Sequence, residues 1–234
     1  MTPTIALPVG VPVTPIDNPT PPRHQSYTGQ FASLTPVDAA ADVAELYAAS
    51  HGDPLREQLW TYMSNGPFAD QAAMQGWLEQ CQVSSEPLFF TVSDTVAQRR
   101  VGAQRRVGVV SFLNIVPVQR RVELGHIWYA PEAQRTKVNT ESIFLMLCEA
   151  FDQQRYRRVE WKCDSLNARS RAAALRLGFQ FEGIFRQHLI VRGRNRDTAW
   201  FGMTDGDWPR VKANLERWLY SDEAGLSLTE MNRS

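Results

Sequence analysis

Cysteine is scarce in this 234-residue chain: it has three, Cys81, Cys148 and Cys163, and no two of them form a CxxC pair. This spacing excludes a zinc ribbon and a disulfide framework, and we expect no metal site. Long apolar runs are also missing, since no stretch approaches the roughly 20 residues that span a bilayer. The N-terminus lacks the basic start and apolar run of a signal peptide. We therefore expect a cytoplasmic protein without a membrane partner.

Net charge is absent as well, because 25 basic side chains balance 25 acidic ones. A protein that coats nucleic acid needs an excess of Lys and Arg, so we expect no nucleic-acid partner. Apolar residues make up 43% of the chain, which is enough for a sizeable core. The length fits one domain, or one domain with an appendage.

Proline is concentrated at the start of the chain, at Pro3, Pro8, Pro12, Pro15, Pro19, Pro21 and Pro22. Because proline removes a backbone donor and fixes φ, this segment cannot be a helix or a central strand. We expect residues 1–26 to form an extended arm and residues 27–221 to form one domain. We expect residues 222–234 to be a frayed tail.

Apolar spacing predicts the order of strands and helices within residues 27–221. Strands are expected over residues 27–34, 88–92, 107–116, 122–129, 159–163, 180–191 and 198–203. Helices are expected after Asp38 and over residues 139–151, 170–177 and 208–220. Gly178 is the expected stop signal of the third of these helices.

A perfect tandem copy runs from Ala97 to Gly108, AQRRVG followed by AQRRVG. An even insertion preserves the face that each side chain takes in a strand. The copy is therefore expected to lengthen a hairpin between two strands without changing their register. We expect its arginines to be solvated at the hairpin tip rather than to bind an anion.

A predicted strand and a predicted helix meet in the sequence YAPEAQRTKVNTE, which begins at Tyr129. The free backbone amides and the dipole of a helix start favour phosphate or pyrophosphate there. Arg135 and Lys137 would add positive charge. The chain has neither a Walker lysine pattern nor a GxGxxG motif, which disfavours the P-loop and Rossmann classes.

The following segment, WKCDSLNARSRAAALRLGFQFEGIFR, places Asn167 after a strand, and an LGF and an EG pair after the next helix. Together with the upstream loop, this order resembles the second half of the GNAT superfamily of acetyltransferases. Residues 27–220 resemble its RimJ/RimL-like branch in four pieces, which are Leu124-Gly125-His126-Ile127, Gln134-Arg135-Thr136 with Asn139-Thr140-Glu141, Asn167 with Ser170, and Gly193 with Arg196-Asp197-Thr198.

The resemblance implies a fold and a function. The fold is α+β, the GNAT fold, with a mostly antiparallel central sheet that contains a splayed strand pair and is flanked by helices. The function is direct transfer of the acetyl group of acetyl-CoA to a primary amine. The amine belongs to a protein N-terminus or to a small molecule such as an aminoacyl-nucleotide. A non-catalytic module that binds CoA is the alternative, and the sequence leaves a homodimer open.

The resemblance also implies where acetyl-CoA binds, along the strand over residues 122–129 and at the loop after it. The implied contacts are Ile127, Trp128, Tyr129, Gln134, Arg135, Thr136, Lys137, Val138, Asn139, Thr140, Asn167 and Ser170. The loop departs from the family pattern Q/R-x-x-G-x-G/A because both glycines are absent. Glycine lets a backbone approach phosphate closely, so side-chain donors of Thr136, Asn139 and Thr140 would have to compensate.

Glu123 and His126 are the candidate general bases, and Asp164 is a weaker third. Glu123 and His126 lie three residues apart, so they project to opposite faces of a regular strand unless a bulge intervenes. Histidine is well suited to accept a proton because its ordinary pKa is about 6.5.

The candidate acid is Ser170. Many GNAT enzymes use a tyrosine seven residues after the motif Asn167, but that position holds Ala174 in this chain. Ser170 resembles the serine of RimL-like enzymes, which would protonate the departing thiolate or bind CoA.

Trp60 and Trp128 are the candidate acceptor-binding residues. Trp60 falls in the early helical region that covers the acceptor site in GNAT proteins, and Trp128 falls on the strand beside the slot. If both face the slot, they could clamp a flat acceptor group. If both are buried, a peptide N-terminus becomes the better interpretation.

Overall fold

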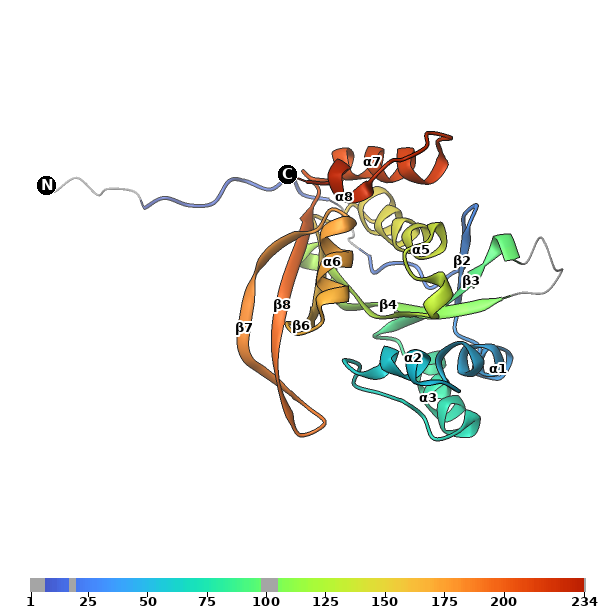
Figure 1. Cartoon of the computed structure of the whole chain (residues 1–234). Helices are drawn as coiled ribbons and strands as arrows, with labels where there is room; N and C mark the ends of the chain where they lie inside the picture. The colour runs from blue at the N-terminus through green and yellow to red at the C-terminus, as the bar shows by residue number, and fades with distance from the viewer. Residues whose placement is uncertain (1–6, 17–19, 98–104, 234) are drawn as a thin grey trace, which may run out of the picture.

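A single mixed sheet of eight strands organises the molecule (Figure 1). The computed structural model describes residues 7–16, 20–97 and 105–233. The strands lie in the order β1-β2-β3-β4-β5-β6-β8-β7, and each neighbouring pair is antiparallel except β5 with β6. Their bounds are β1 Tyr27–Thr28, β2 Ala32–Pro36, β3 Leu88–Asp94, β4 Arg106–Val116, β5 Arg121–Tyr129, β6 Arg158–Asp164, β7 Gln180–Val191 and β8 Arg194–Thr204. The expected mostly antiparallel α+β sheet is confirmed.

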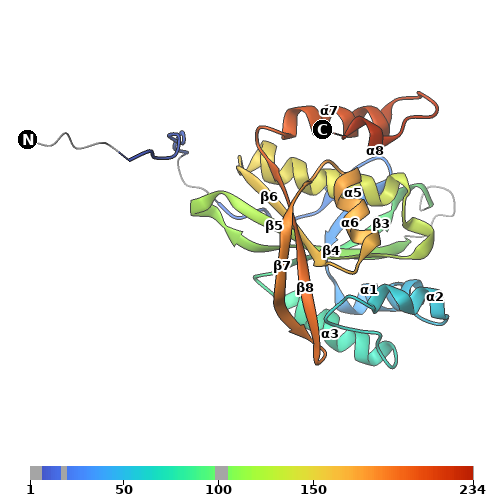
Figure 2. The same cartoon turned by 60° about the vertical axis from the view of Figure 1, so that its left-hand side comes forward.

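Helices cover both faces of this sheet (Figures 1 and 2). One face carries α1 (Ala39–Ser50), α2 (Pro54–Glu57) and α3 (Gln71–Val83). The other carries α5 (Lys137–Cys148), α6 (Ala168–Arg176), α7 (Trp208–Tyr220) and α8 (Leu228–Met231). Short turns complete the chain: η1 (Gln58–Trp60), η2 (Pro117–Gln119), η3 (Pro131–Ala133) and the π-helical η4 (Glu149–Gln153). Among the described helices, none is long and apolar enough to cross a membrane.

The hydrophobic core is divided between the two faces of the sheet. On the α5 side, Leu124, Phe144, Trp161 and Phe201 belong to one buried cluster. On the α1 and α3 side, the second cluster contains Val43, Trp60, Trp77, Phe89, Val109 and Trp128. Neighbouring strand residues fall in different clusters, as Phe90 and Val110 of the first cluster show beside Phe89 and Val109 of the second, because side chains in a strand alternate between faces.

Local sequence signals account for several helix ends. Asp38 accepts a hydrogen bond from the Ala41 amide as the N-cap of α1, as expected. Gly178 follows α6 with φ +95°, a conformation that suits glycine, and the expected stop signal is confirmed.

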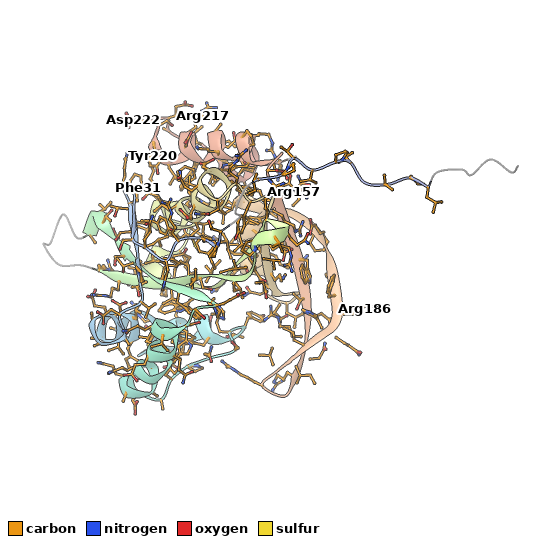
Figure 3. The ribbon with its side chains drawn as sticks, turned by 180° about the vertical axis from the view of Figure 1, so that it is seen from behind. Phe31, Arg157, Arg186, Arg217, Tyr220 and Asp222 are labelled. Carbon is orange, nitrogen blue, oxygen red and sulfur yellow. The ribbon has the colours of Figure 1, made fainter. Side chains whose placement is uncertain are left out.

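A buried carboxylate, Glu141 of α5, fastens the turn between β1 and β2 to the end of α7. It accepts hydrogen bonds from the backbone amides of Phe31 (2.6 Å) and Ala32 (2.7 Å), and from the Tyr220 hydroxyl (2.8 Å). Phe31 and Tyr220 lie close together, with their rings stacked (Figure 3). Any side chain at Gly29 would collide with this carboxylate, so the turn needs glycine there.

The C-terminal tail is ordered, so the expectation of a frayed tail is wrong. Leu228 of α8 is buried in the first core cluster, and α8 packs against α6 and α7. The Asn232 amide donates to the Arg176 carbonyl (2.9 Å), and the Asn214 amide donates to the Met231 carbonyl (2.7 Å). These bonds satisfy carbonyl groups that helix ends leave open, which holds the tail in place.

The proline-containing arm contacts the domain at Thr14, whose carbonyl accepts from Arg120 (3.3 Å), and again near its junction with the domain. Arg23 forms an ion pair with Glu149 (3.1 Å), and the Tyr156 hydroxyl donates to the Thr20 carbonyl (3.0 Å). Residues 7–12 are exposed and extend away from the domain (Figure 2).

The tandem copy lies only partly within the described residues, because residues 98–104 fall outside them. Arg105 pairs with Glu132 (2.9 Å), while Arg106 pairs with Glu45 (2.5 Å) and Asp42. The Arg106 side chain is only 13% exposed. The expectation of a solvated arginine is therefore wrong for Arg106, which ties β4 to α1 instead.

Candidate active site

The parallel strands β5 and β6 pair only over part of their length. Their paired residues run from Arg121 with Arg158 to Leu124 with Trp161. From Gly125 onward β5 pairs with β4 alone, and from Lys162 onward β6 pairs with β8 alone. The two strands therefore diverge and leave a slot between them, which is the expected splayed pair. Along residues 125–129, backbone groups on the slot side have no β6 partner and are available to a ligand.

A β-bulge lies in β5 at the mouth of this slot. Val109 pairs with Trp128 and Ser111 pairs with Gly125, so β5 holds one residue more than β4 between these pairs. His126, at the bulge, has a φ of +50°. The extra residue returns the His126 side chain to the face that carries Glu123, and the opposite-face expectation for a regular strand does not apply.

His126 has one hydrogen-bonded ring nitrogen. Nδ1 lies 2.8 Å from the Ser111 hydroxyl, and the ring packs against Phe89 with centroids 4.8 Å apart. Nε2 makes no hydrogen bond within the described part of the chain. Burial lowers the pKa of His126 below its ordinary value of about 6.5. The imidazole is therefore neutral at pH 7 and can accept a proton.

Glu123, in contrast, is held through one of its two carboxylate oxygens. Its Oε2 accepts from Lys162 Nζ (2.7 Å) and from Asn114 Nδ2 (2.6 Å), and the residue is buried. Lys162 also contacts Glu160 (3.0 Å) and lies over the Trp200 ring at 3.7 Å. The structure thus brings Glu123 and His126 to one face. Glu123 is paired with a cation through Oε2, whereas the His126 ring contacts no charged group among the described residues.

Sequence reasoning missed Ser111, Asn114 and Lys162 as partners of the two candidate bases. Alternation along β6 could have found Lys162, because Trp161 and Cys163 beside it are apolar and buried on the opposite face. Ser111 and Asn114 depend on the register of β4 with β5, which the sequence alone does not fix.

The loop after β5 ends in a capped helix start. Thr136 caps α5 by accepting from the Val138 backbone amide (3.2 Å), and the Gln134 side-chain Nε2 donates to the Tyr129 carbonyl (3.0 Å). Arg135 has a φ of +60°, a left-handed conformation that usually favours glycine. A tight turn before α5 is thus formed without the glycines of the family pattern.

Two arginines lie near this helix start. Arg176 donates to the Thr140 hydroxyl (3.0 Å). Burial and the positive charge of Arg135 both lower the pKa of Arg176. Neither guanidinium has a carboxylate partner among the described residues. Two cations without carboxylate partners in the described structure, beside the positive end of a helix dipole, are suited to a pyrophosphate.

Lys137 does not add to this charge, contrary to expectation. Its ammonium donates to the Leu219 carbonyl (2.6 Å) and lies 4.7 Å from the centre of the Phe31 ring. Asn139 is different, because its buried amide oxygen has no hydrogen-bond partner in the described structure. A buried amide without a partner fits a site that a polar ligand completes.

The start of α6 places Ser170 through its cap. Asn167 Oδ1 accepts from the Ser170 amide (3.0 Å), so the asparagine is an N-cap. The Ser170 hydroxyl accepts from the Trp161 indole nitrogen (3.0 Å), and its own proton, which faces the Cys163 thiol, can be donated to a ligand. Asp164 accepts from the Leu166 amide (2.9 Å) within the turn before α6, so the third candidate base serves that turn.

The proposed clamp of Trp60 and Trp128 is not present. Trp60 has no exposed surface and Trp128 is 3% exposed. Their ring centroids lie 5.1 Å apart with the planes at 51°, and the Trp60 indole donates to the Ser50 carbonyl (3.3 Å). The two rings contact each other within the second core cluster, so no flat group can lie between them.

The hairpin of β7 and β8 lies on the β6 side of the slot. It extends from the sheet down to the level of α3, as both ribbon views show (Figures 1 and 2). At its tip, the Arg192 guanidinium donates to the carbonyls of Asn65 (2.7 Å) and Gly66. The Tyr62 hydroxyl donates to the Leu166 carbonyl (3.2 Å). The loop between η1 and α3 is thus held over the face that carries His126. Within the described residues, no cluster of His, Cys, Asp and Glu could hold a metal ion.

Comparisons with known proteins agree with this geometry. A family model described as "Acetyltransferase (GNAT) domain" matches residues 33–180, more than half of the chain. A GCN5-related N-acetyltransferase from Brucella melitensis superposes with a TM-score of 0.84 at 38% identity, over 93% of this chain and 99% of that one. A GNAT-family structure from Chromobacterium violaceum ATCC 12472 gives 0.75 at 35% identity, over 86% and 99%.

A curated relative from Bacillus subtilis (strain 168) is named "Putative ribosomal N-acetyltransferase YdaF". It is 30% identical over 105 residues, which cover 45% of this chain and 57% of that protein. The matched region thus spans little more than half the length of this relative. The chain belongs to the GNAT superfamily of N-acetyltransferases, and its relatives agree with the RimJ/RimL-like branch.

Proposed function

We propose that this N-acetyltransferase transfers the acetyl group of acetyl-CoA directly to a primary amine, with a peptide N-terminus as the favoured acceptor. The observation that carries the proposal is the bulge of β5 at the mouth of the slot. It sets a neutral histidine beside backbone groups that have no partner in β6. An acyl transfer needs this combination, a base for the amine and donors for the acyl oxygen.

The residues around the slot suit CoA. Arg135, Arg176 and the first amides of α5 would hold the pyrophosphate, and Asn139 would meet a polar group of the same molecule. The backbone of residues 125–129 would hold the pantetheine arm. Bound there, acetyl-CoA supplies the acetyl group as a thioester.

His126 is the proposed base, because its Nε2 is free and its lowered pKa keeps it neutral at pH 7. It takes the proton from the ammonium of the acceptor, directly or through one water. Glu123 is the second candidate, and its carboxylate would act through Lys162, which lies beside it. Ser170 is the proposed acid, because its oxygen accepts from Trp161 and its proton can be donated to a ligand.

The burial of the two candidate clamp tryptophans supports a peptide as the acceptor. With Trp60 and Trp128 buried, the clamp that would favour a flat, nucleotide-bearing amine is lost. A relative named as a ribosomal N-acetyltransferase adds support for a protein acceptor. Small amines and aminoacyl-nucleotides are the competing acceptors in the test.

The test measures free-thiol release from acetyl-CoA with N-terminal peptides, polyamines, amino acids and aminoacyl-nucleotide analogues. Turnover fastest with peptides, together with mass-spectrometric acetylation of the α-amine, is the expected result. Faster turnover with another amine would reassign the acceptor. Tight CoA binding with no release in any assay would favour the alternative, a non-catalytic CoA-binding module.

We also propose a homodimer, formed through β7. This strand is the edge of the sheet, and its exposed apolar side chains are Phe181, Ile184, Phe185, Leu189 and Ile190. A long edge strand with exposed apolar side chains can pair with the same strand of a second copy of the chain. Light scattering should give twice the chain mass, and Ile190→Asp, at a residue 83% exposed, should shift it to the monomer. A monomeric wild type would rule the dimer out.

A further inference from the structure

The contacts of Ser111 determine which nitrogen of His126 carries the proton. Its hydroxyl oxygen lies 3.0 Å from the Gly125 carbonyl oxygen and 2.8 Å from His126 Nδ1. A carbonyl oxygen only accepts, so the single Ser111 proton goes to Gly125. The hydroxyl oxygen then accepts from His126, whose Nδ1 must be the N–H donor. Because neutral imidazole has one N–H, Nε2 carries the lone pair.

A second serine–histidine pair in the same molecule shows that this geometry reports that tautomer. The Ser50 hydroxyl donates to the Leu46 carbonyl (2.8 Å) and lies 2.9 Å from His51 Nδ1. Here the other ring nitrogen also has a hydrogen-bond partner, because the Phe68 backbone amide donates to His51 Nε2 (2.8 Å). A backbone N–H cannot accept, so His51 has its proton on Nδ1.

We propose that Ser111 is a positioning residue of the acetyl transfer, which holds His126 as the Nδ1–H tautomer with Nε2 ready to accept a proton. The inference rests on the proposed role of His126 as the base. The proton leaves the ammonium of the acceptor and forms the N–H bond at Nε2. The electron pair left on the acceptor nitrogen is then free to attack the thioester carbon. An Nε2–H tautomer cannot take this proton.

Among the described residues around His126, Ser111 is the one that determines its tautomer. Ser111 of β4 and Phe89 of β3 are its described contacts, and both are uncharged. The charged groups on the same face are Glu123 of β5 and Lys162 and Glu160 of β6, and Lys162 pairs with both carboxylates. Ser111 itself has no exposed surface, so water does not replace its hydroxyl.

The test records the imidazole ¹⁵N shifts of wild type, Ser111→Ala and Ser50→Ala, with His126 assigned through His126→Ala. Wild type should show the Nδ1–H form at both His51 and His126. Ser111→Ala should give mixed tautomers at His126 alone. It should also lower kcat about 10-fold at pH 7 and leave the KM for acetyl-CoA unchanged. The expected loss is smaller than the whole contribution of a general base, because part of the histidine keeps the active tautomer. Ser111→Thr, which keeps the hydroxyl, should restore the tautomer and most of the rate.

Ser50→Ala is the matched control, because Phe68 still holds His51 and the rate should be unchanged. An Nε2–H form of His126 in wild type would overturn the inference, and so would an unchanged tautomer in Ser111→Ala. These spectra need no turnover. A wild type with the expected tautomer but no acetyl transfer would refute the proposed function while leaving the tautomer assignment intact.

Discussion

Two serine–histidine pairs occupy opposite roles in this molecule. At Ser50 and His51, both ring nitrogens are bonded, and the ring joins the end of α1 to the Phe68 amide. At Ser111 and His126, one nitrogen is bonded and the other is free, at a β-bulge beside the slot. Burial lowers the pKa of both histidines. The difference teaches that a lowered pKa marks a base only where the second nitrogen has no partner.

The largest expected effect separates the two histidines by rate. His126→Ala should lower kcat about 100-fold or more, because general-base catalysis contributes on that scale. Thiol release with the best amine of the panel measures it, and His51→Ala is the control. Equal losses of kcat in both variants would contradict the proposed difference between the two histidines.

A smaller effect is expected at Glu123. Glu123→Gln keeps the shape and one hydrogen bond but removes the charge that faces Lys162. Because Glu123 is the second candidate base and its Oε2 is already paired with Lys162, kcat should fall less than about 10-fold. Glu160→Gln, at the other carboxylate that contacts Lys162, is the matched variant. A loss as large as that of His126→Ala would exchange the roles of Glu123 and His126.

The smallest effect on rate is expected at His51, where the cost is in stability. His51→Ala leaves the Phe68 amide without its acceptor, which should lower the free energy of unfolding by about 1–3 kcal/mol. Urea unfolding measures this cost, and kcat should change less than about twofold. An unchanged midpoint would show that His51 does not hold the loop.

The sequence was informative where signals are local. The strand over residues 180–191 and the helix over 208–220 were predicted with their observed bounds, because alternation, capping and helical spacing act within a few residues. The LGF and EG pieces placed α6 and β7 correctly.

What the sequence could not show depends on register and long-range contacts. The bulge at His126 needs the pairing of β4 with β5, and the Ser111 contact follows from it. The partners of Lys137 and Trp60 are likewise far away in the sequence, at Leu219 and Trp128. The chemistry of Lys137 and Trp60 favoured a binding role, but both side chains are occupied by contacts within the protein.

The pH dependence of kcat/KM tests the central claim, that neutral His126 is the base, most directly. Thiol release would be followed from about pH 5 to about pH 8 in wild type and His126→Ala. Because burial lowers the pKa of His126, the wild-type rate should be level near pH 7 and fall about 10-fold per pH unit once the pH drops below that pKa, with the bend below about pH 6.5. His126→Ala should be slower and lack this bend. The same bend in both proteins would contradict the account and assign the proton to another group.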